Sequence, residues 1–321
     1  MMMQTKTAGP GSFSGFDLSS VPSPCFVTDM ARLEDNLRLL NAVTEASGAH
    51  ILTALKAFSL WSTAPLVSRY LAGACASGLY EARLARAHYS GLLSCFAPAY
   101  KTDEMDELAG LCDHIIFNTP HQISRFSGQA TAQGAELGLR VNPCLPQGEV
   151  EKYDPAAPRS RLGTPVSQLA DYHFDQISGL HVHSLCEQGF SELANVVDVV
   201  KPLLDRADGR LSWLNLGGGH MITAPDYDRE ALINCLCDLK QRYDLDIYLE
   251  PGTAIAFDAG ILVGEVMDIM ENDGPIAILD ISATCHMPDV LEAPYRPALL
   301  AEADTGTCLL YTSPSPRDFQ V

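Results

Sequence analysis

The chain has 321 residues, of which 47% are hydrophobic, so it can bury a large core in one or two domains and is not a disordered protein. Its 21 Lys and Arg against 40 Asp and Glu give a net charge of -19, which excludes the basic surface of a general nucleic-acid binder and suits a cationic ligand. No apolar run reaches the roughly 20 residues of a membrane span, and the N-terminus lacks the apolar core of a secretory signal.

The ten cysteines show neither the spacing of a disulfide framework nor a Cys-x-x-Cys motif. Cys75, Cys95 and Cys112 lie inside apolar segments, where small buried thiols are common. We therefore expect a reducing, cytoplasmic location.

Short apolar runs alternate with helical patterns after a flexible arm, which we predict over residues 1–15. A helix is expected over Met30–Ala46, with Asp29 as its N-cap, and amphipathic helices over Tyr80–Tyr89 and Ser191–Leu204. The alternation predicts eight strands, which are His50–Lys56, Gly73–Ser77, Leu92–Phe96, His114–Asn118, Glu136–Asn142, Ile177–His183, Leu211–Leu216 and Asp246–Glu250.

Eight mostly apolar strands that alternate with helices predict an α/β fold, a TIM-like (β/α)8 barrel over residues 16–256. A doubly wound open sheet is the alternative. The polar residues favour the barrel, because they lie at the C-terminal ends of the strands, where barrel enzymes place their active sites. These polar residues are Lys56, Asn118, Arg140, Asn142, His181, His183, Asn215 and Glu250.

The pattern changes after the eighth strand. Gly260–Met270 and Pro275–Ile281 are typical of strands with no helix between them, which predicts the start of an antiparallel β-domain over residues 257–306. The segment Cys308–Asp318, CLLYTSPSPRD, resembles the translation of a sequencing-library adapter. We therefore expect residues 307–321 to be non-native and the β-domain to be truncated; an ordinary Pro- and Ser-rich tail is the alternative.

Lys56 ends the first predicted barrel strand, in the sequence LTALKAFS. The barrel wall can desolvate a lysine at this position, which lowers its pKa and frees the amine for Schiff-base formation. The alternative is a side chain that reaches solvent, since lysines are seldom buried.

Three glycines, Gly217, Gly218 and Gly219, follow the seventh strand in LNLGGGH. They allow backbone N–H groups to converge on an anion, and barrels often bind phosphate after strands seven and eight. A tight turn without a ligand is the alternative. Glu250 closes the eighth strand in YLEPGTA, where its carboxylate needs a partner such as a protonated pyridine nitrogen.

His181 and His183 face the same side of the sixth strand, in GLHVHSLCEQ. Such a pair can hold a metal ion, but the sequence offers no complete ligand set, so we predict no metal site. An imidazole stacked on a planar cofactor, with Ser184 reaching a phosphate, fits the pattern better.

The order of lysine, arginine, histidine, glycines and glutamate along these strands makes the chain resemble the carboxynorspermidine/carboxyspermidine decarboxylases. These enzymes belong to the fold-type III group of pyridoxal-phosphate enzymes, with ornithine and diaminopimelate decarboxylases as relatives. The resemblance runs from about Val21 to Pro297. It rests on PSPCFVTD, LKAFS, CASGLYEARLA, HVHSLCEQ, LNLGGGH, EPGTA and DISATCHMPDVLEAPYRP.

The resemblance implies a role for each candidate residue. Lys56 would hold the cofactor as a Schiff base, His181 would stack on its ring, and Glu250 would pair with the ring nitrogen. Arg140 matches an arginine near the cofactor. The other cofactor-binding residues would be Ser184, Gly217, Gly218, Gly219, Gly252 and Thr253, and the substrate-binding residues Glu250, His286, Asp289 and Asp280.

Two departures from the resemblance concern the phosphate and the partner subunit. Relatives have EPGR where this chain has EPGT, so Thr253 would offer the phosphate a hydroxyl instead. The group also has a Gly-Pro-Ser/Thr-Cys segment, whose cysteine enters the partner's site, and a later tyrosine near the phosphate. Neither is found, and Cys308 and Tyr311 are not assigned to these roles.

The implied activity is pyridoxal-phosphate-dependent decarboxylation of the polyamine precursors carboxynorspermidine or carboxyspermidine, in a homodimer with shared active sites and without nucleic-acid or membrane partners. Acidic residues at the barrel mouth would bind the substrate's ammonium groups. The alternatives are another basic amino-acid decarboxylase of this group, a metal-dependent hydrolase barrel, and a pyridoxal-phosphate-binding protein without turnover.

Overall fold

The computed structural model describes residues 13–148, 151–292, 295, 297, 299, 300 and 309–311. By its internal contacts the chain divides into two units. The larger unit comprises residues 34–257, and the smaller unit combines the described parts of residues 1–33 and 258–321.

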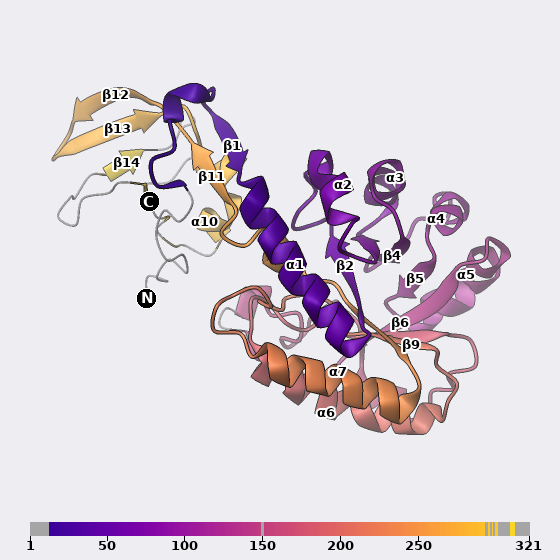
Figure 1. The fold of residues 1–321 in the computed structure, drawn as a ribbon. Helices are drawn as coiled ribbons and strands as arrows, with labels where there is room; N and C mark the ends of the chain where they lie inside the picture. The colour runs from indigo at the N-terminus through magenta and orange to yellow at the C-terminus, as the bar shows by residue number, and fades with distance from the viewer. Residues whose placement is uncertain are drawn as a thin grey trace. The chain divides into compact units, whose positions relative to one another are not determined.

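The larger unit is a closed barrel of parallel strands (Figure 1). Its strands are β2 (His50–Ala54), β3 (Gly73–Ala76), β4 (Leu92–Phe96), β5 (His114–Phe117), β6 (Glu136–Asn142), β8 (Gly179–His181), β9 (Trp213–Asn215) and β10 (Asp246–Leu249). They follow the order β5-β4-β3-β2-β10-β9-β8-β6, and the pairing of β5 with β6 closes the ring. The predicted barrel and its eight strands are confirmed, and the open sheet is wrong.

The helices of this part of the chain are α1 (Met30–Ser47), α2 (Ala64–Val67), α3 (Leu79–His88), α4 (Met105–Leu111), α5 (Pro120–Ala132), α6 (Phe190–Ala207), α7 (Arg229–Tyr243) and α8 (Thr253–Ala256), and the division between the units falls within α1. Figure 1 shows α2 to α7 on the outside of the barrel. The three predicted helices correspond to α1, α3 and α6. The predicted N-cap is also confirmed, because Asp29 Oδ1 accepts the N–H groups of Ala31 at 2.9 Å and Arg32 at 3.0 Å.

Short elements complete the larger unit. The 3-10 helices η3 (Trp61–Thr63), η4 (Glu151–Tyr153) and η5 (Val166–Leu169) lie in connections between barrel elements. The two-residue strand β7 (Thr164–Pro165) pairs in parallel with the end of β6. No helix among the described residues has the length and apolar character that a membrane crossing requires.

The smaller unit is built from short sheets. Strand β1 (Cys25–Thr28), which follows the 3-10 helix η2 (Leu18–Ser20), pairs antiparallel with β11 (Gly260–Val263). Strand β12 (Val266–Glu271) pairs antiparallel with β13 (Pro275–Leu279), and β14 (Leu309–Tyr311) runs parallel to β13. The helices α9 (Ala283–His286) and α10 (Pro288–Glu292) follow β13.

The prediction of antiparallel strands after the barrel is confirmed, although the expected strand over Gly260–Met270 is divided into β11 and β12. Residues 16–33 differ from expectation, because they group with the smaller unit through the pairing of β1 with β11. Residues 1–12 of the predicted arm, and residues 307, 308 and 312–321 of the predicted tail, lie outside the described residues. The flexible arm, the non-native tail and the truncation remain predictions.

Trp213 fills the N-terminal end of the barrel. Its side chain is buried and packs in a cluster with Leu52, Ile116 and Tyr248. The indole stacks on His114, with ring centroids 4.4 Å apart and an angle of 6° between the planes. Its Nε1–H donates to the Glu136 carboxylate at 2.9 Å, so the one polar atom of the indole is satisfied.

Two glycines leave the space that this indole occupies. A Cβ on Gly179 would lie 2.0 Å from Trp213 Cδ2, and a Cβ on Gly138 would lie 2.4 Å from Trp213 Cη2. Glycine is therefore required at both positions by the packing of one large side chain in a densely packed core.

We expect Gly179→Ala to lower the free energy of unfolding by about 3 kcal/mol, because the added methyl group overlaps the Trp213 ring. Urea denaturation followed by circular dichroism measures the change. The matched control is Gly128→Ala in α5, where an added Cβ meets nothing within 4 Å; it should stabilise the protein by up to about 1 kcal/mol. An unchanged midpoint for Gly179→Ala would contradict this account of the packing.

Candidate active site

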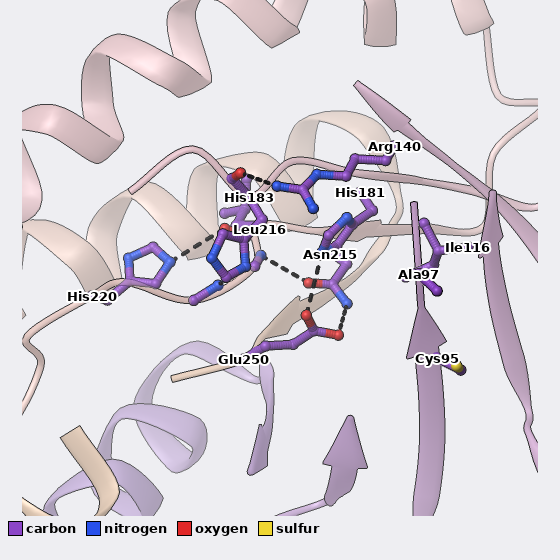
Figure 2. A network of polar contacts seen from close by, with 12 residues as sticks. Cys95, Ala97, Ile116, Arg140, His181, His183, Asn215, Leu216, His220 and Glu250 are labelled. Atoms are coloured by element: carbon purple, nitrogen blue, oxygen red, sulfur yellow. Dashed lines mark hydrogen bonds and ion pairs between the residues drawn. The ribbon is translucent and has the colours of Figure 1, made fainter. Parts of the chain in front are cut away.

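The candidate residues come from neighbouring strands. Strands β2, β10, β9, β8 and β6 follow one another in the barrel, and parallel strands place their C-terminal ends at one rim. Lys56 follows β2, Glu250 follows β10, Asn215 ends β9, His181 ends β8 and Arg140 lies near the end of β6. Figure 2 shows the last four of these side chains together with His183.

Glu250 is a buried carboxylate with a partner on each oxygen. Asn215 Nδ2 donates to Oε1 at 2.7 Å, and His181 Nε2 lies 3.3 Å from Oε2 (Figure 2). Burial alone raises the pKa of this carboxyl, but the hydrogen bonds from His181 and Asn215, together with the positive charge of Lys56, outweigh it and hold the pKa below its usual value. Glu250 is therefore ionised at neutral pH.

His181 is buried and neutral at the barrel mouth. Burial lowers its pKa, although the hydrogen bond with Glu250 acts in the opposite direction. Because an ionised carboxylate only accepts, we assign the imidazole proton to Nε2. The Nδ1 atom is buried and has no hydrogen-bond partner among the described residues.

Phe96 contacts two of the predicted site residues, His181 and Arg140. Its ring stacks on His181 with centroids 5.5 Å apart, and the Arg140 guanidinium lies 4.3 Å from its centroid. Arg140 also donates from Nη2 to the His183 carbonyl at 2.6 Å, and although burial lowers its pKa to about 9, it stays charged at neutral pH. The sequence predicted that Phe96 ends a strand, but only the structure shows that its ring contacts His181 and Arg140.

Lys56 is exposed, just past the end of β2. The reading in which this side chain reaches solvent therefore holds, and the barrel wall does not desolvate it. Lys56 still interacts electrostatically with Glu250, His181, His183 and Cys75, so its positive charge belongs to the barrel mouth.

The glycine loop is held by side chains from two strands. Gly217 N–H donates to Asn215 Oδ1 at 2.8 Å, and Gly218 N–H donates to His183 Nδ1 at 3.1 Å. A Cβ on Gly218 would lie 2.2 Å from the Glu250 carbonyl oxygen, so the backbone packs too closely for any larger residue. The tight turn is shown by these contacts, while phosphate binding by the loop remains a prediction.

Ser184 supplies an unsatisfied polar atom next to His183. Its side chain is 2% exposed, and its Oγ has no hydrogen-bond partner among the described residues. A buried hydroxyl without a partner is costly unless a ligand or water satisfies it. The predicted role of Ser184 in binding a polar ligand is consistent with this position.

Gly252 and Thr253 lie beside the Lys56 segment. Gly252 is the N-cap of α8, and a Cβ on it would lie 2.4 Å from the Cβ of Ala57. Ala54 N–H also donates to the Pro251 carbonyl at 3.3 Å. Thr253 is exposed at the start of the helix, so its hydroxyl is accessible to a ligand.

The predicted substrate-binding residues Asp280, His286 and Asp289 belong to the smaller unit. Asp280 accepts hydrogen bonds from Ser23 Oγ at 2.7 Å and Glu265 N–H at 2.8 Å. Asp289 accepts one from the Tyr295 hydroxyl at 2.7 Å. These contacts lie within the smaller unit, and a role in substrate binding remains a prediction for all three residues.

His181, His183 and Glu250 form a possible metal-ligand set that was not predicted from the sequence. One ligand atom from each lies within 4.8 Å of the others. The sequence indicated the histidine pair without a third ligand, and Glu250 supplies that ligand from β10, two strands away in the barrel. A signal was present in the sequence, because both segments end strands of the same predicted barrel.

The unfolding free energy should fall as the pH is lowered from 6.5 to 4, because His220 is buried and its pKa is lowered by burial to about 4. The unfolded chain takes up a proton on this residue in that range and the native chain does not, which corresponds to at most about 3 kcal/mol. His220→Gln, which cannot titrate, should reduce this slope in urea denaturation series. The exposed His121→Gln is the control, and equal slopes for both variants would refute the assignment.

No protein-family model matches the chain. A carboxynorspermidine/carboxyspermidine decarboxylase from Campylobacter jejuni is 38% identical over 280 residues, which cover 87% of this chain and 73% of the relative. A carboxyaminopropylagmatine decarboxylase from Synechocystis is 36% identical over 282 residues, which again cover 87% of this chain and 73% of the relative.

Solved structures show the same fold. The crystal structure of carboxynorspermidine decarboxylase from Campylobacter jejuni in complex with norspermidine superposes with a TM-score of 0.81 at 34% identity, covering 90% of this chain and 80% of that one. Diaminopimelate decarboxylase from Helicobacter pylori in complex with L-lysine has a TM-score of 0.73 at 18% identity, covering 94% and 82%. At that identity the second similarity concerns the fold alone.

Proposed function

We propose that this chain decarboxylates carboxynorspermidine to norspermidine or carboxyspermidine to spermidine, because it belongs to the carboxynorspermidine/carboxyspermidine decarboxylase family of pyridoxal-phosphate enzymes. The observation that supports this most is the ionised, buried Glu250 with Asn215 and His181 on its two oxygens and the charge of Lys56 nearby. We also propose that the chain forms a homodimer whose two subunits share their active sites.

The residues at the barrel mouth fit pyridoxal phosphate. Lys56 and Arg140 are cations and Glu250 is an anion, so these three groups leave an excess of positive charge for a phosphate. Ser184 Oγ and His181 Nδ1 are buried polar atoms without partners among the described residues. A planar, phosphorylated pyridine has the charge and the polar groups that such a site lacks.

Each residue would then have a distinct task. When bound, the cofactor supplies an electron-withdrawing ring that accepts the electron pair left by the departing carboxylate. Lys56 offers the exposed primary amine that would hold the cofactor covalently. Glu250, kept ionised by its hydrogen bonds, would hold the proton on the ring nitrogen, and His181 would lie against the ring. Ser184 would bind the phosphate, with Thr253 at the adjacent helix start.

A cationic substrate suits the charge of the chain. The net charge is -19, and a polyamine carries several ammonium groups. The Campylobacter jejuni relative is named for carboxynorspermidine and carboxyspermidine, and the Synechocystis relative for carboxyaminopropylagmatine. Carboxynorspermidine, carboxyspermidine and carboxyaminopropylagmatine are therefore the substrates to compare. We propose that the chain prefers carboxynorspermidine or carboxyspermidine.

A metal-dependent hydrolase is the second candidate, because of the three possible ligands His181, His183 and Glu250. One observation weighs against it. The positive charges of Lys56 and Arg140 act on both histidines. A divalent cation at this position would have to overcome their repulsion.

We expect the purified chain to develop a visible absorption band with pyridoxal phosphate, and Lys56→Ala to abolish it, because no other amine would hold the cofactor at this position. Decarboxylation, measured as carbon dioxide release from each of the three compounds, should fall by at least about 100-fold. The matched control is Lys101→Ala, which removes an exposed lysine that pairs with Glu104.

Three results would contradict the proposal in different ways. Stoichiometric zinc without an absorption band would favour the hydrolase. A band that survives in Lys56→Ala would reject the assigned lysine. A band without release of carbon dioxide from any of the three compounds would leave a pyridoxal-phosphate-binding protein without turnover.

A further inference from the structure

Asn215 connects two parts of the candidate site with one side chain. It lies at the end of β9 and is 0% exposed. Its Nδ2 donates to Glu250 Oε1 at 2.7 Å, and its Oδ1 accepts the N–H of Gly217 at 2.8 Å. Figure 2 shows the Asn215 amide next to the Glu250 carboxylate, with a dashed line for the hydrogen bond between them.

The orientation of this amide is fixed by chemistry. Gly217 N–H can only donate, so the atom facing it is the carbonyl oxygen. The nitrogen therefore faces the carboxylate of Glu250, which can only accept while it is ionised. No other uncharged side chain of this size offers one donor and one acceptor in these directions.

The two partners of Asn215 are also joined through the backbone. Glu250 N–H donates to the Gly217 carbonyl at 2.7 Å, and a Cβ on Gly218 would collide with the Glu250 carbonyl oxygen. The carboxylate and the start of the glycine loop therefore share both a backbone contact and a side-chain contact. A substitution at Asn215 therefore removes the side-chain contact and leaves the backbone contact in place.

We infer that Asn215 is a positioning residue that aligns the Glu250 carboxylate with the glycine loop Gly217–Gly219, so that one side chain sets both the ring-nitrogen end and the phosphate end of the cofactor site. This inference rests on the proposed function. In this view Asn215 sets the distance between the Glu250 carboxylate and the glycine loop, which neither of them determines alone.

Two substitutions separate the two contacts. Asn215→Asp keeps an acceptor for Gly217 N–H and replaces the donor to Glu250 with a second carboxylate. Asn215→Ala removes both contacts. The matched control is Asn41→Asp in α1, where Asn41 Nδ2 donates to Glu45 Oε1 at 2.8 Å on an exposed surface.

The test measures dissociation constants for pyridoxal 5'-phosphate and for pyridoxal, which lacks the phosphate, by isothermal titration calorimetry on the full chain. Asn215→Asp should weaken both by the same factor, about 10- to 100-fold, because only the ring end loses its alignment. Asn215→Ala should weaken the phosphorylated compound more than pyridoxal. Asn41→Asp should change neither.

The pH dependence of cofactor affinity separates this positioning role from a merely structural one, which would leave that dependence unchanged. In Asn215→Asp two carboxylates share one site, so a proton is held between them at low pH and lost as the pH rises. The affinity of this variant for pyridoxal 5'-phosphate should approach that of the unaltered chain at pH 5 and fall relative to it by pH 8. Parallel profiles for the two proteins would overturn the inference.

A double variant distinguishes misfolding from lost alignment. In Asn215→Asp with Glu250→Gln the hydrogen bond can form again with its polarity reversed, so the thermal unfolding midpoint should recover while cofactor affinity does not. A midpoint that stays as low as that of Asn215→Asp alone would overturn the inference, because the contact between these two side chains would then not hold them together. If the unaltered chain binds no pyridoxal 5'-phosphate, the proposed function fails and the inference with it; if it binds and the Asn215 variants bind equally well, the inference alone fails.

Discussion

An ionised carboxylate held inside the barrel mouth is the constraint on which the rest of the site depends. A buried charge is tolerated only with partners, and Glu250 has a hydrogen-bonded neighbour on each oxygen. Those partners are themselves fixed, His181 by stacking on Phe96 and Asn215 by the glycine loop. The loop, the histidine and the carboxylate therefore form one connected arrangement.

The barrel brings this arrangement together from distant parts of the sequence. Parallel strands align their C-terminal ends, and β2 and β10 are neighbours although the first begins and the last completes the barrel. Lys56 and Glu250 are therefore close enough to interact electrostatically. At the opposite end of the barrel, Trp213 occupies the space left by Gly138 and Gly179. The same strands therefore need polar side chains at one end and glycines at the other.

The sequence predicted the barrel well because apolar strands and helical patterns alternate, and strand ends carried Lys56, Arg140, His181 and Glu250. It could not predict the contacts of Phe96 and Asn215, since these depend on how the strands are arranged around the barrel. The exposure of Lys56 and the pairing of β1 with β11 also depend on tertiary contacts. Local patterns contain no information on either.

The position of Trp213 also gives the protein a built-in optical reporter. The chain has two tryptophans, and the other, Trp61, is 54% exposed while Trp213 is 2% exposed. The two indoles therefore sit in very different polarities, and emission at shorter wavelengths comes from the barrel interior. Loss of that component would signal opening of the barrel itself, whereas Trp61 would report only on the surface.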